Sequence, residues 1–297
     1  MNSRSPSTSA SPVADAVSGA LPLCLIGEGI ASSPSRVMQE AALRAVGREG
    51  SYDIVNVGPA QLPGVLADLR AGRWRGANVT TPYKFALASV CDELEGDAVL
   101  AGAVNTITVT ADGDLIGANT DAAGFQMALK GRALWPEPES RALVFGAGGA
   151  AAAVVLALTR VPVLRTTIVA RRINMARSLV DRLSAGGAEG DVAVGLWDED
   201  YLERLAEAAD IVVNATAAGA ADLPLTPARL RPSCTVADVR YRPRPVDLVA
   251  ASLEAGLRAC DGVDMLLNQG MLSFRRWTGL EPPFDAARAA LEEALGP

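Results

Sequence analysis

A glycine-rich turn between a short apolar run and a helical run constrains this chain more than any other feature. Residues 142–145 are apolar and typical of a buried strand, and the next six, from Gly146 to Ala151, are G-A-G-G-A-A. Gly146 permits a tight turn, Gly148 lets a pyrophosphate approach the backbone, and the small Ala151 lets helix and strand pack closely. The free N–H groups of the helix N-terminus then face the phosphates. The pattern predicts a Rossmann-type unit whose dinucleotide contacts include Gly146, Ala147, Gly148, Gly149 and Ala150.

Short apolar runs alternate with amphipathic runs along the rest of the chain, which indicates parallel βα units. We expect strands at 21–26, 52–57, 76–79, 142–145, 167–170, 192–195, 211–214 and 235–238. A hairpin is expected at 106–109 and 114–116 across Asp112-Gly113. Helices are expected at 36–46, 65–71, 82–94, 150–158, 175–183, 265–277 and 286–295. The predicted fold is α/β, with an α/β/α substrate domain followed by a doubly wound dinucleotide-binding domain.

The order of these runs divides the chain into four parts. Residues 1–20 are rich in Ser, Ala and Pro and are expected to be a disordered leader, because they lack the charged start and long apolar run of a signal peptide. We expect a substrate-binding and catalytic domain at 21–121, an NADP-binding Rossmann domain at 122–263, and C-terminal helices at 264–297. No stretch is apolar and long enough to span a membrane, so we expect a cytoplasmic protein without a membrane partner.

Charge and composition exclude several classes of function. The net charge of −7 argues against a nucleic-acid partner, because phosphate binding needs clustered Lys and Arg. Histidine is absent and the four cysteines form no C-x-x-C pair, which argues against a metal site or a His-based triad. Proton transfer must then use Lys, Asp, Glu, Tyr or water. The scattered cysteines, Cys24, Cys91, Cys234 and Cys260, are typical of buried apolar positions in a reduced protein.

Two arginines follow the second strand of the dinucleotide unit. An enzyme that uses NAD usually has Asp or Glu there, bound to the ribose 2′-hydroxyl. This chain has Arg171 and Arg172, whose guanidinium groups suit a 2′-phosphate. The other interpretation is a solvated, basic start to the next helix. We predict NADP as the cofactor, with NAD as the less favoured alternative.

Three polar residues at the ends of predicted elements are candidates for the reaction itself. Thr81 is a suitable N-cap and Pro82 a suitable first helical residue, so Lys84 falls in the first turn, where a cation opposes the helix dipole. A proton-transferring lysine explains that position, although spacing alone favours a solvated lysine. Asp121 lies where the first unit ends, beside the expected cleft. Asn105 is a third short polar side chain, or else forms an Asx turn.

Seven ordered motifs between residues 21 and 279 make the chain resemble the shikimate dehydrogenase family, including its quinate-using members. They are 76–84 (G-x-N-V-T-x-P-x-K), 102–106 (G-A-V-N-T), 117–125 (G-x-N-T-D-x-x-G-F), 146–150 (G-A-G-G-A), 210–219 (D-[IV]-V-V-N-A-T-x-x-G), 238–243 (D-x-x-Y-x-P) and 261–269 (D-G-x-x-M-L-x-x-Q). The resemblance implies that Lys84 and Asp121 form the catalytic pair. It also implies that the C-terminal helices, from about Met265, return to the first domain.

The resemblance also implies binding roles for residues of the other motifs. Asn105 and Gln269 would hydrogen-bond the ring hydroxyls of the substrate, and Thr80 would help to hold the ring. Tyr241 would lie near both the nicotinamide and the substrate. Residues expected around the cofactor are Asn214, Thr216 and Gly262.

The chain departs from the family near its start. The family pattern Ser-x-Ser-Pro-x-x-His holds the substrate carboxylate, and an ungapped comparison places Ser33 and Ser35 on its two serines. Arg36 then replaces the proline and Gln39 the histidine. Ser33 alternatively caps a helix that starts at Pro34. Arg36 is expected either to add a cation near the carboxylate or to point to solvent. Two further departures are Val246, where threonine is common, and Asn268.

The resemblance predicts a shikimate dehydrogenase that reduces 3-dehydroshikimate reversibly with NADPH in aromatic amino-acid biosynthesis. The substrate is expected to be shikimate or a close cyclohexene or cyclohexane carboxylate, and the protein a monomer or a homodimer. One alternative is a quinate or aminoshikimate dehydrogenase, which could also be NAD-linked. Another is a paralogue that senses a metabolite without turnover, which the departures at Arg36 and Gln39 keep open. A folate one-carbon dehydrogenase is disfavoured by the motifs at 119–121 and 261–269.

Overall fold

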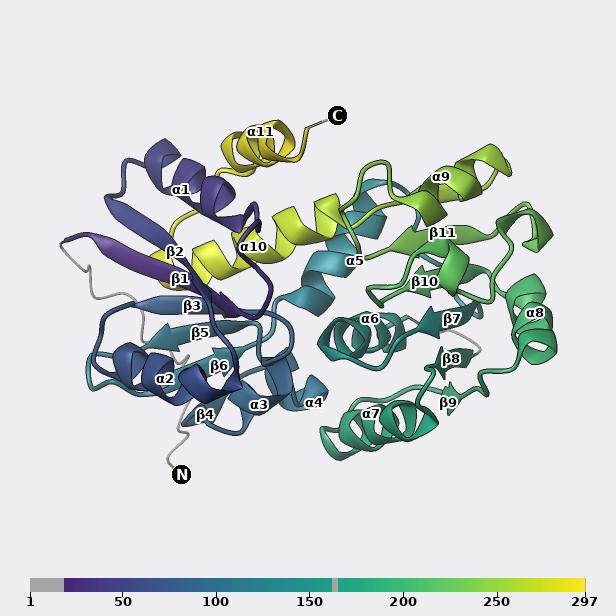
Figure 1. Cartoon of the computed structure of the whole chain (residues 1–297), viewed down its shortest axis with the longest axis horizontal. Helices are drawn as coiled ribbons and strands as arrows, with labels where there is room; N and C mark the ends of the chain where they lie inside the picture. The colour runs from purple at the N-terminus through teal and green to yellow at the C-terminus, as the bar shows by residue number, and fades with distance from the viewer. Residues whose placement is uncertain (1–18, 162–164, 297) are drawn as a thin grey trace, which may run out of the picture.

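Two α/β units lie side by side in the computed structural model, which describes residues 19–161 and 165–296 (Figure 1). The leader predicted for residues 1–20 lies outside the described residues, apart from its last two. Long helices between the units join them, and the chain crosses from the first unit to the second and back.

The first unit is built on a mixed six-stranded sheet in the order β2-β1-β3-β5-β6-β4. Strands β1 and β2 are parallel, as are β1 and β3, whereas β5 is antiparallel to both β3 and β6. The predicted hairpin is therefore the β5–β6 pair. The strands are β1 (Leu21–Gly27), β2 (Gly50–Asn56), β3 (Gly76–Val79), β4 (Glu93–Leu94), β5 (Thr106–Val109) and β6 (Leu115–Ala118), and the helices are α1 (Ser35–Ala45), α2 (Leu62–Arg70), α3 (Lys84–Ala88) and α4 (Asp97–Ala101).

The second unit is a doubly wound domain with an all-parallel sheet in the order β12-β11-β10-β7-β8-β9. Reading outward from β7, this is the Rossmann strand order, with the change of direction between β7 and β10. The predicted fold class is confirmed. The strands are β7 (Arg141–Phe145), β8 (Arg165–Val169), β9 (Val192–Val194), β10 (Ile211–Asn214), β11 (Thr235–Asp238) and β12 (Arg258–Cys260), and the helices are α6 (Gly149–Thr159), α7 (Ile173–Ala185), α8 (Glu199–Ala208) and α9 (Asp247–Glu254).

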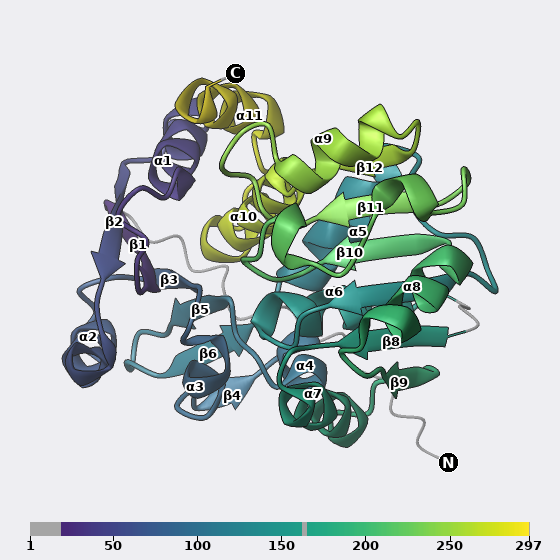
Figure 2. The ribbon, with the colours of Figure 1, turned by 45° about the vertical axis from the view of Figure 1, so that its right-hand side comes forward.

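Three further helices connect and complete the two units. Helix α5 (Asp121–Gly131) leads into the second unit and packs on both α6 and α10 (Val263–Thr278). Helix α11 (Phe284–Leu295) lies along α1, as Figure 2 shows, and its Leu291 belongs to the same buried cluster as Leu23 of β1. The C-terminal helices therefore return to the first unit, as predicted. The boundaries at residues 121 and 263 stay a prediction.

The long helix predicted at 82–94 is wrong. The Thr81–Pro82 peptide is cis, Tyr83 is the N-cap, and α3 covers only Lys84–Ala88. The chain then turns away because the Asp92 carboxylate accepts hydrogen bonds from Arg70 and from the backbone N–H of Leu115, which brings β4 into the sheet.

Within the described residues, four α-helices and two strands were not predicted from the sequence. They are α4, α5, α8 and α9, with β4 and β12. Helix α5 contains Gly124 and ends at Gly131, both of which weaken a helix by intrinsic propensity. Packing overrides propensity here, because a Cβ on Gly124 would lie 2.8 Å from the backbone nitrogen of Gln269 in α10. The glycine lets α5 and α10 approach closely.

Among the cysteines, Cys24, Cys234 and Cys260 are buried as expected, and Cys91 is half-buried.

Replacement of Gly76 by Ala is expected to destabilise the fold by about 1–3 kcal/mol, because an added methyl group overpacks a filled core. Its Cβ would lie 2.3 Å from Nε1 of Trp277, and that nitrogen is held by a 2.9 Å hydrogen bond to the carbonyl of Ile107. Urea unfolding followed by tryptophan fluorescence measures the loss. Gly131→Ala is the matched control, since nothing lies within 4 Å of its added Cβ. If the two variants unfolded at the same midpoint concentration of urea, the expectation would be contradicted.

Candidate active site

A cleft of about 250 Å³ lies between the two units. Its walls come from the first unit, the second unit and α10. The residues that line it include Ser33, Ser35, Thr80, Lys84, Asp121, Ala150, Tyr241, Gly262 and Gln269, all of them predicted site residues. A larger hollow of about 380 Å³ lies at the opposite, amino end of β7 and β8, and none of the predicted site residues lines it. The cleft is therefore the candidate site.

An ion pair between Lys84 and Asp121 forms one wall of the cleft. The Lys84 Nζ lies 2.5 Å from Asp121 Oδ2, and the side chains are 14% and 5% exposed. Lys84 is the first residue of α3, and Asp121 is the first residue of α5. A carboxylate is favoured at a helix N-terminus and a cation is not, so the pair offsets the unfavourable position of the lysine. The structure thus brings together two side chains from distant parts of the sequence.

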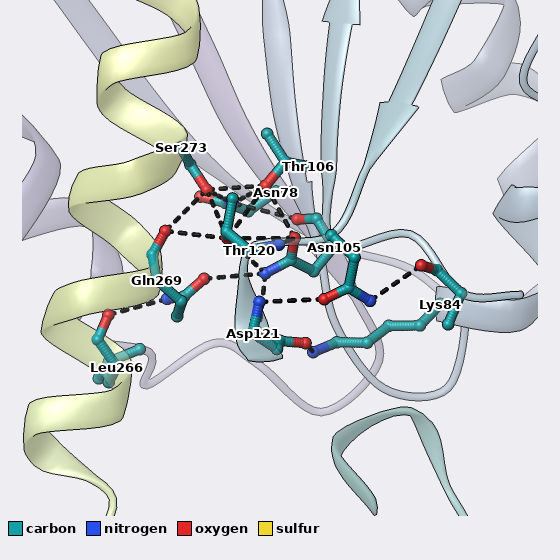
Figure 3. A network of polar contacts seen from close by, with 11 residues as sticks. Asn78, Lys84, Asn105, Thr106, Thr120, Asp121, Leu266, Gln269 and Ser273 are labelled. Carbon is teal, nitrogen blue, oxygen red and sulfur yellow. Dashed lines mark hydrogen bonds and ion pairs between the residues drawn. The ribbon is translucent and has the colours of Figure 1, made fainter. Parts of the chain in front are cut away.

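Asn105 orients the carboxylate from behind the cleft wall. Its Nδ2 donates to Asp121 Oδ1 at 2.8 Å and also contacts Gln269 Oε1 at 3.2 Å. Its Oδ1 accepts the backbone N–H of Thr120 at 2.8 Å (Figure 3). Asn105 is 1% exposed and does not line the cleft. It therefore holds Asp121 and Gln269 relative to each other, and its expected contact with a substrate hydroxyl stays a prediction.

A buried chain of polar side chains continues from Gln269 into the first sheet. The Thr120 hydroxyl donates to the Gln269 carbonyl at 3.0 Å and lies 3.2 Å from the Ser273 hydroxyl. Asn78 Nδ2 donates to Ser273 at 3.0 Å, and the Tyr52 hydroxyl donates to Asn78 Oδ1 at 2.7 Å. Because each of these groups has a partner, the chain stiffens the wall rather than weakening the core. Burial raises the pKa of Tyr52, so this phenol stays a donor.

Sequence reasoning missed Tyr52 and Ser273 in this chain. Asn78 carried a signal, since it is the asparagine of the G-x-N-V-T motif. Tyr52 and Ser273 belong to no motif, and only packing brings them to Asn78.

Three hydroxyl groups also line the cleft, those of Ser33, Ser35 and Tyr241. Ser33 Oγ donates to Ser35 Oγ at 3.1 Å, and Tyr241 faces them from the second unit. Burial raises the pKa of Tyr241, while the charge of Arg242 and a hydrogen bond with Ser33 act in the opposite direction. The phenol is therefore neutral near pH 7 and able to donate.

Neither of the two unusual residues near the start reaches the cleft. Arg36 Nε donates to the Tyr52 carbonyl at 2.9 Å and is not among the lining residues. Gln39 is fully buried, and its Nε2 donates to the Gly270 carbonyl at 2.8 Å. Arg36 therefore adds no cation to the cleft. Gln39 ties α1 to α10 next to Gln269.

The glycine turn has the geometry that a pyrophosphate site needs. Gly146 has φ +120°, and a Cβ there would lie 2.7 Å from the Ala215 carbonyl, so only glycine fits. Nothing lies within 4 Å of a Cβ on Gly148, which leaves its backbone open to a ligand. Helix α6 begins at Gly149 without a side-chain cap, so its first N–H groups are free to bind phosphate. The residues present fit a dinucleotide.

Other predicted cofactor residues surround this turn. Arg171 and Arg172 are exposed just beyond the end of β8. Asn214 is fully buried, and its Oδ1 accepts from the backbone N–H and the hydroxyl of Thr216, so it shapes the loop after β10. Gly262 lines the cleft, where a Cβ would lie 2.0 Å from the Val239 carbonyl. The cofactor contacts themselves stay predictions.

Metal-binding clusters and membrane-spanning helices are absent from the described residues. Within residues 19–161 and 165–296, no group of three or more Cys, Asp or Glu side chains is arranged to hold a metal ion. In the same part of the chain, no helix combines the length and apolarity needed to cross a membrane.

Comparisons with known proteins agree on one family. Family models match the shikimate dehydrogenase substrate binding domain at residues 25–107 and the shikimate 5′-dehydrogenase C-terminal domain at 262–292. A shikimate dehydrogenase (NADP(+)) of Rubrobacter xylanophilus is 42% identical over 272 residues, which cover 90% of this chain and 94% of that protein.

Solved structures resemble the chain over nearly its whole length. The shikimate 5-dehydrogenase of Thermus thermophilus, in complex with NADP(H) and shikimate, has a TM-score of 0.80 and 34% identity, covering 93% of this chain and 100% of that one. A quinate dehydrogenase of Corynebacterium glutamicum in complex with NAD has a TM-score of 0.81 and 31% identity. The match covers 91% of this chain and 98% of that one.

The two glycines of the turn are expected to respond differently to alanine. Gly146→Ala should destabilise the protein by about 1–3 kcal/mol, because its φ and the Ala215 carbonyl both exclude a Cβ. Gly148→Ala should leave the melting temperature unchanged and weaken NADPH binding, since its Cβ would point into open space where the ligand approaches. Thermal denaturation and NADPH fluorescence titration measure the two effects. A stable Gly146→Ala variant would contradict the assigned turn geometry.

Proposed function

The chain belongs to the shikimate dehydrogenase family, and from that premise we propose that it reduces 3-dehydroshikimate to shikimate reversibly with NADPH. This is a step of aromatic amino-acid biosynthesis. One observation carries the proposal: the Lys84–Asp121 pair lies in a cleft that also reaches Ala150 of the glycine turn. An acid–base group and a dinucleotide site thus face the same space.

Lys84 is the proton donor in this proposal. NADPH, when bound, supplies the hydride that the carbonyl carbon accepts. The Lys84 ammonium donates a proton to the carbonyl oxygen, which becomes the hydroxyl, and solvent then returns a proton to the amine. Asp121 holds the ammonium through Oδ2 and is itself held by Asn105 through Oδ1. In the reverse direction the neutral amine accepts the hydroxyl proton.

The hydroxyls that line the cleft suit a carboxylate held by neutral donors. Ser33, Ser35 and Tyr241 present hydroxyls there, and Asp121 already neutralises Lys84. We assign the carboxylate to these three hydroxyls, and the ring hydroxyls to Gln269 with Thr80 at the ring edge. Neutral donors bind a carboxylate without drawing the substrate away from the catalytic pair.

NADP follows from the residues beyond β8. Arg171 and Arg172 are exposed there, and no carboxylate occupies the position that would bind a free ribose hydroxyl. Quinate dehydrogenase activity is the second candidate, because the enzyme of Corynebacterium glutamicum shares this fold at 31% identity. The intact Lys84–Asp121 pair argues against a sensing paralogue. We also propose a cytoplasmic location and a monomer or homodimer.

Lys84→Ala is expected to lower kcat by at least about 100-fold, as loss of a general acid–base group does. The Kd for NADPH should change little, because the Lys84 ammonium is held by Asp121 and not by the glycine turn. The assay follows reduced nicotinamide absorbance with shikimate and NADP⁺, and fluorescence titration gives the Kd. Lys130→Ala, an exposed lysine over the Trp135 ring, is the control. A wild-type rate in Lys84→Ala would remove the lysine from the mechanism.

Replacement of both Arg171 and Arg172 by Ala is expected to weaken NADPH binding roughly 10- to 100-fold, because hydrogen bonds to charged groups are worth about 1.5–3 kcal/mol. Binding of NADH, which lacks the 2′-phosphate, should hardly change. Arg165→Ala at the opposite end of β8 is the matched control. Equal losses for both nucleotides would show that the arginines do not select the 2′-phosphate.

A further inference from the structure

A short segment with arginines at alternate positions lies between β11 and α9 of the second unit. We call residues Arg240–Arg244 the arginine strap. Tyr241, which lines the cleft, lies between the first two arginines of this segment. Because Arg240 and Arg242 bind opposite sides of the cleft, their contacts determine where Tyr241 is held.

Arg240 anchors the strap to its own unit. Its side chain is 12% exposed, and its Nη2 donates to Asp238 Oδ2 and to Asp247 Oδ1 at 2.6 Å each. Asp238 is fully buried at the end of β11, and Asp247 Oδ2 accepts the backbone N–H of Ala220. The hydrogen bond with Asp238 contributes most to raising the pKa of Arg240. This end of the strap is therefore fixed on the dinucleotide-binding side.

Arg242 reaches from the strap to the other side of the cleft. Its Nη1 donates to the Ser32 carbonyl and its Nη2 to the Ala294 carbonyl, each at 2.8 Å. Ser32 belongs to the loop between β1 and α1, and Ala294 to the last turn of α11. Figure 2 shows the segment before α9 passing beside this end of α11.

The chemistry of the α11 C-terminus favours these contacts. The last carbonyls of a helix have no partner within the helix and carry partial negative charge, which favours a cation. Arg244 adds a second bond of the same kind, from Nη1 to the Gly296 carbonyl at 3.1 Å. Since α11 packs on α1 of the first unit, both arginines join the two units.

We propose that Arg242 is a positioning residue that latches the strap onto the Ser32 loop and so brings Tyr241 and Ser33 together. The proposal rests on the proposed function, because the two hydroxyls are those assigned to the substrate carboxylate. Ser32 directly precedes Ser33, and Arg242 directly follows Tyr241. One guanidinium thus sets the spacing of two substrate-binding groups that come from different units. Asn105 holds the Lys84–Asp121 pair separately, so the latch affects substrate affinity more than turnover.

The test compares Arg242→Gln, Arg242→Lys and Arg231→Gln in the full chain. Arg242→Gln should raise the KM for shikimate about tenfold, because Tyr241 and Ser33 lose their fixed spacing, with kcat within about threefold. The NADPH Kd should equal that of the wild type, and the melting temperature should fall no further than in Arg231→Gln. Arg231 is the control, because it too donates to two acceptors, the Ala208 carbonyl and the Asp210 carboxylate, but joins only parts of the second unit.

Arg242→Lys distinguishes positioning of Tyr241 and Ser33 by the guanidinium from attraction of the anionic substrate by its positive charge. A lysine keeps the charge but lacks the planar fork that reaches two carbonyls, so the latch predicts a KM close to that of Arg242→Gln. Full recovery by lysine would overturn the latch in favour of attraction between charges. An unchanged KM in Arg242→Gln would overturn the inference outright. A wild-type protein without activity on shikimate would instead overturn the proposed function.

Discussion

The ion pair between Lys84 and Asp121 is the interaction on which the rest of the site depends. Removing two charges from water costs several kcal/mol each, and only good geometry with further hydrogen bonds compensates for it. Here the compensation comes from the start of α5, from Asn105 and from the chain of polar side chains behind it. The two charges face the cleft rather than the core, so a substrate oxygen is able to replace part of the lost hydration. The arrangement keeps the ammonium group that we propose as the proton donor inside the cleft.

Close backbone approach is the second constraint, and it explains several motif glycines in terms of packing. A Cβ on Gly149 would lie 2.8 Å from Cδ of Lys84, so the glycine turn of the second unit directly contacts the stem of the lysine. Gly124 similarly admits α10 against α5, and Gly262 admits the Val239 carbonyl. Gly149 in particular brings the two units close enough to share one cleft. The missing side chains serve the chemistry indirectly, because close packing fixes the distance between the proton donor and the dinucleotide site.

The proposed carboxylate site lies on a protein of net charge −7, and it relies on neutral donors. The cations near the cleft are each bound to another group of the protein. Lys84 is neutralised, Arg36 is bonded to a backbone carbonyl outside the cleft, and Arg240 is held by two carboxylates. The hydroxyls that line the cleft are therefore the donors that we assign to the carboxylate, and the exposed Arg171 and Arg172 suit a phosphate. The arginines on either side of Tyr241 bind groups of the protein outside the cleft. In our proposal, substrate binding therefore depends on the relative position of the two units.

The sequence by itself determined the α/β fold class, the glycine turn and the candidate residues, since periodicity, turn chemistry and motif spacing are local properties of the chain. The Gly146 turn, the β5–β6 hairpin and most strands followed from such signals. Tertiary structure decided what depends on contacts between distant residues. It shortened the helix after Pro82, formed α5 in spite of Gly124, and sent Arg36 and Gln39 away from the cleft. It also joined Tyr52, Asn78 and Ser273, and carried Arg242 to Ser32 and Ala294. No local pattern encodes these contacts, because their energy comes from burial and hydrogen bonding that exist only once the two units and the C-terminal helices have packed together.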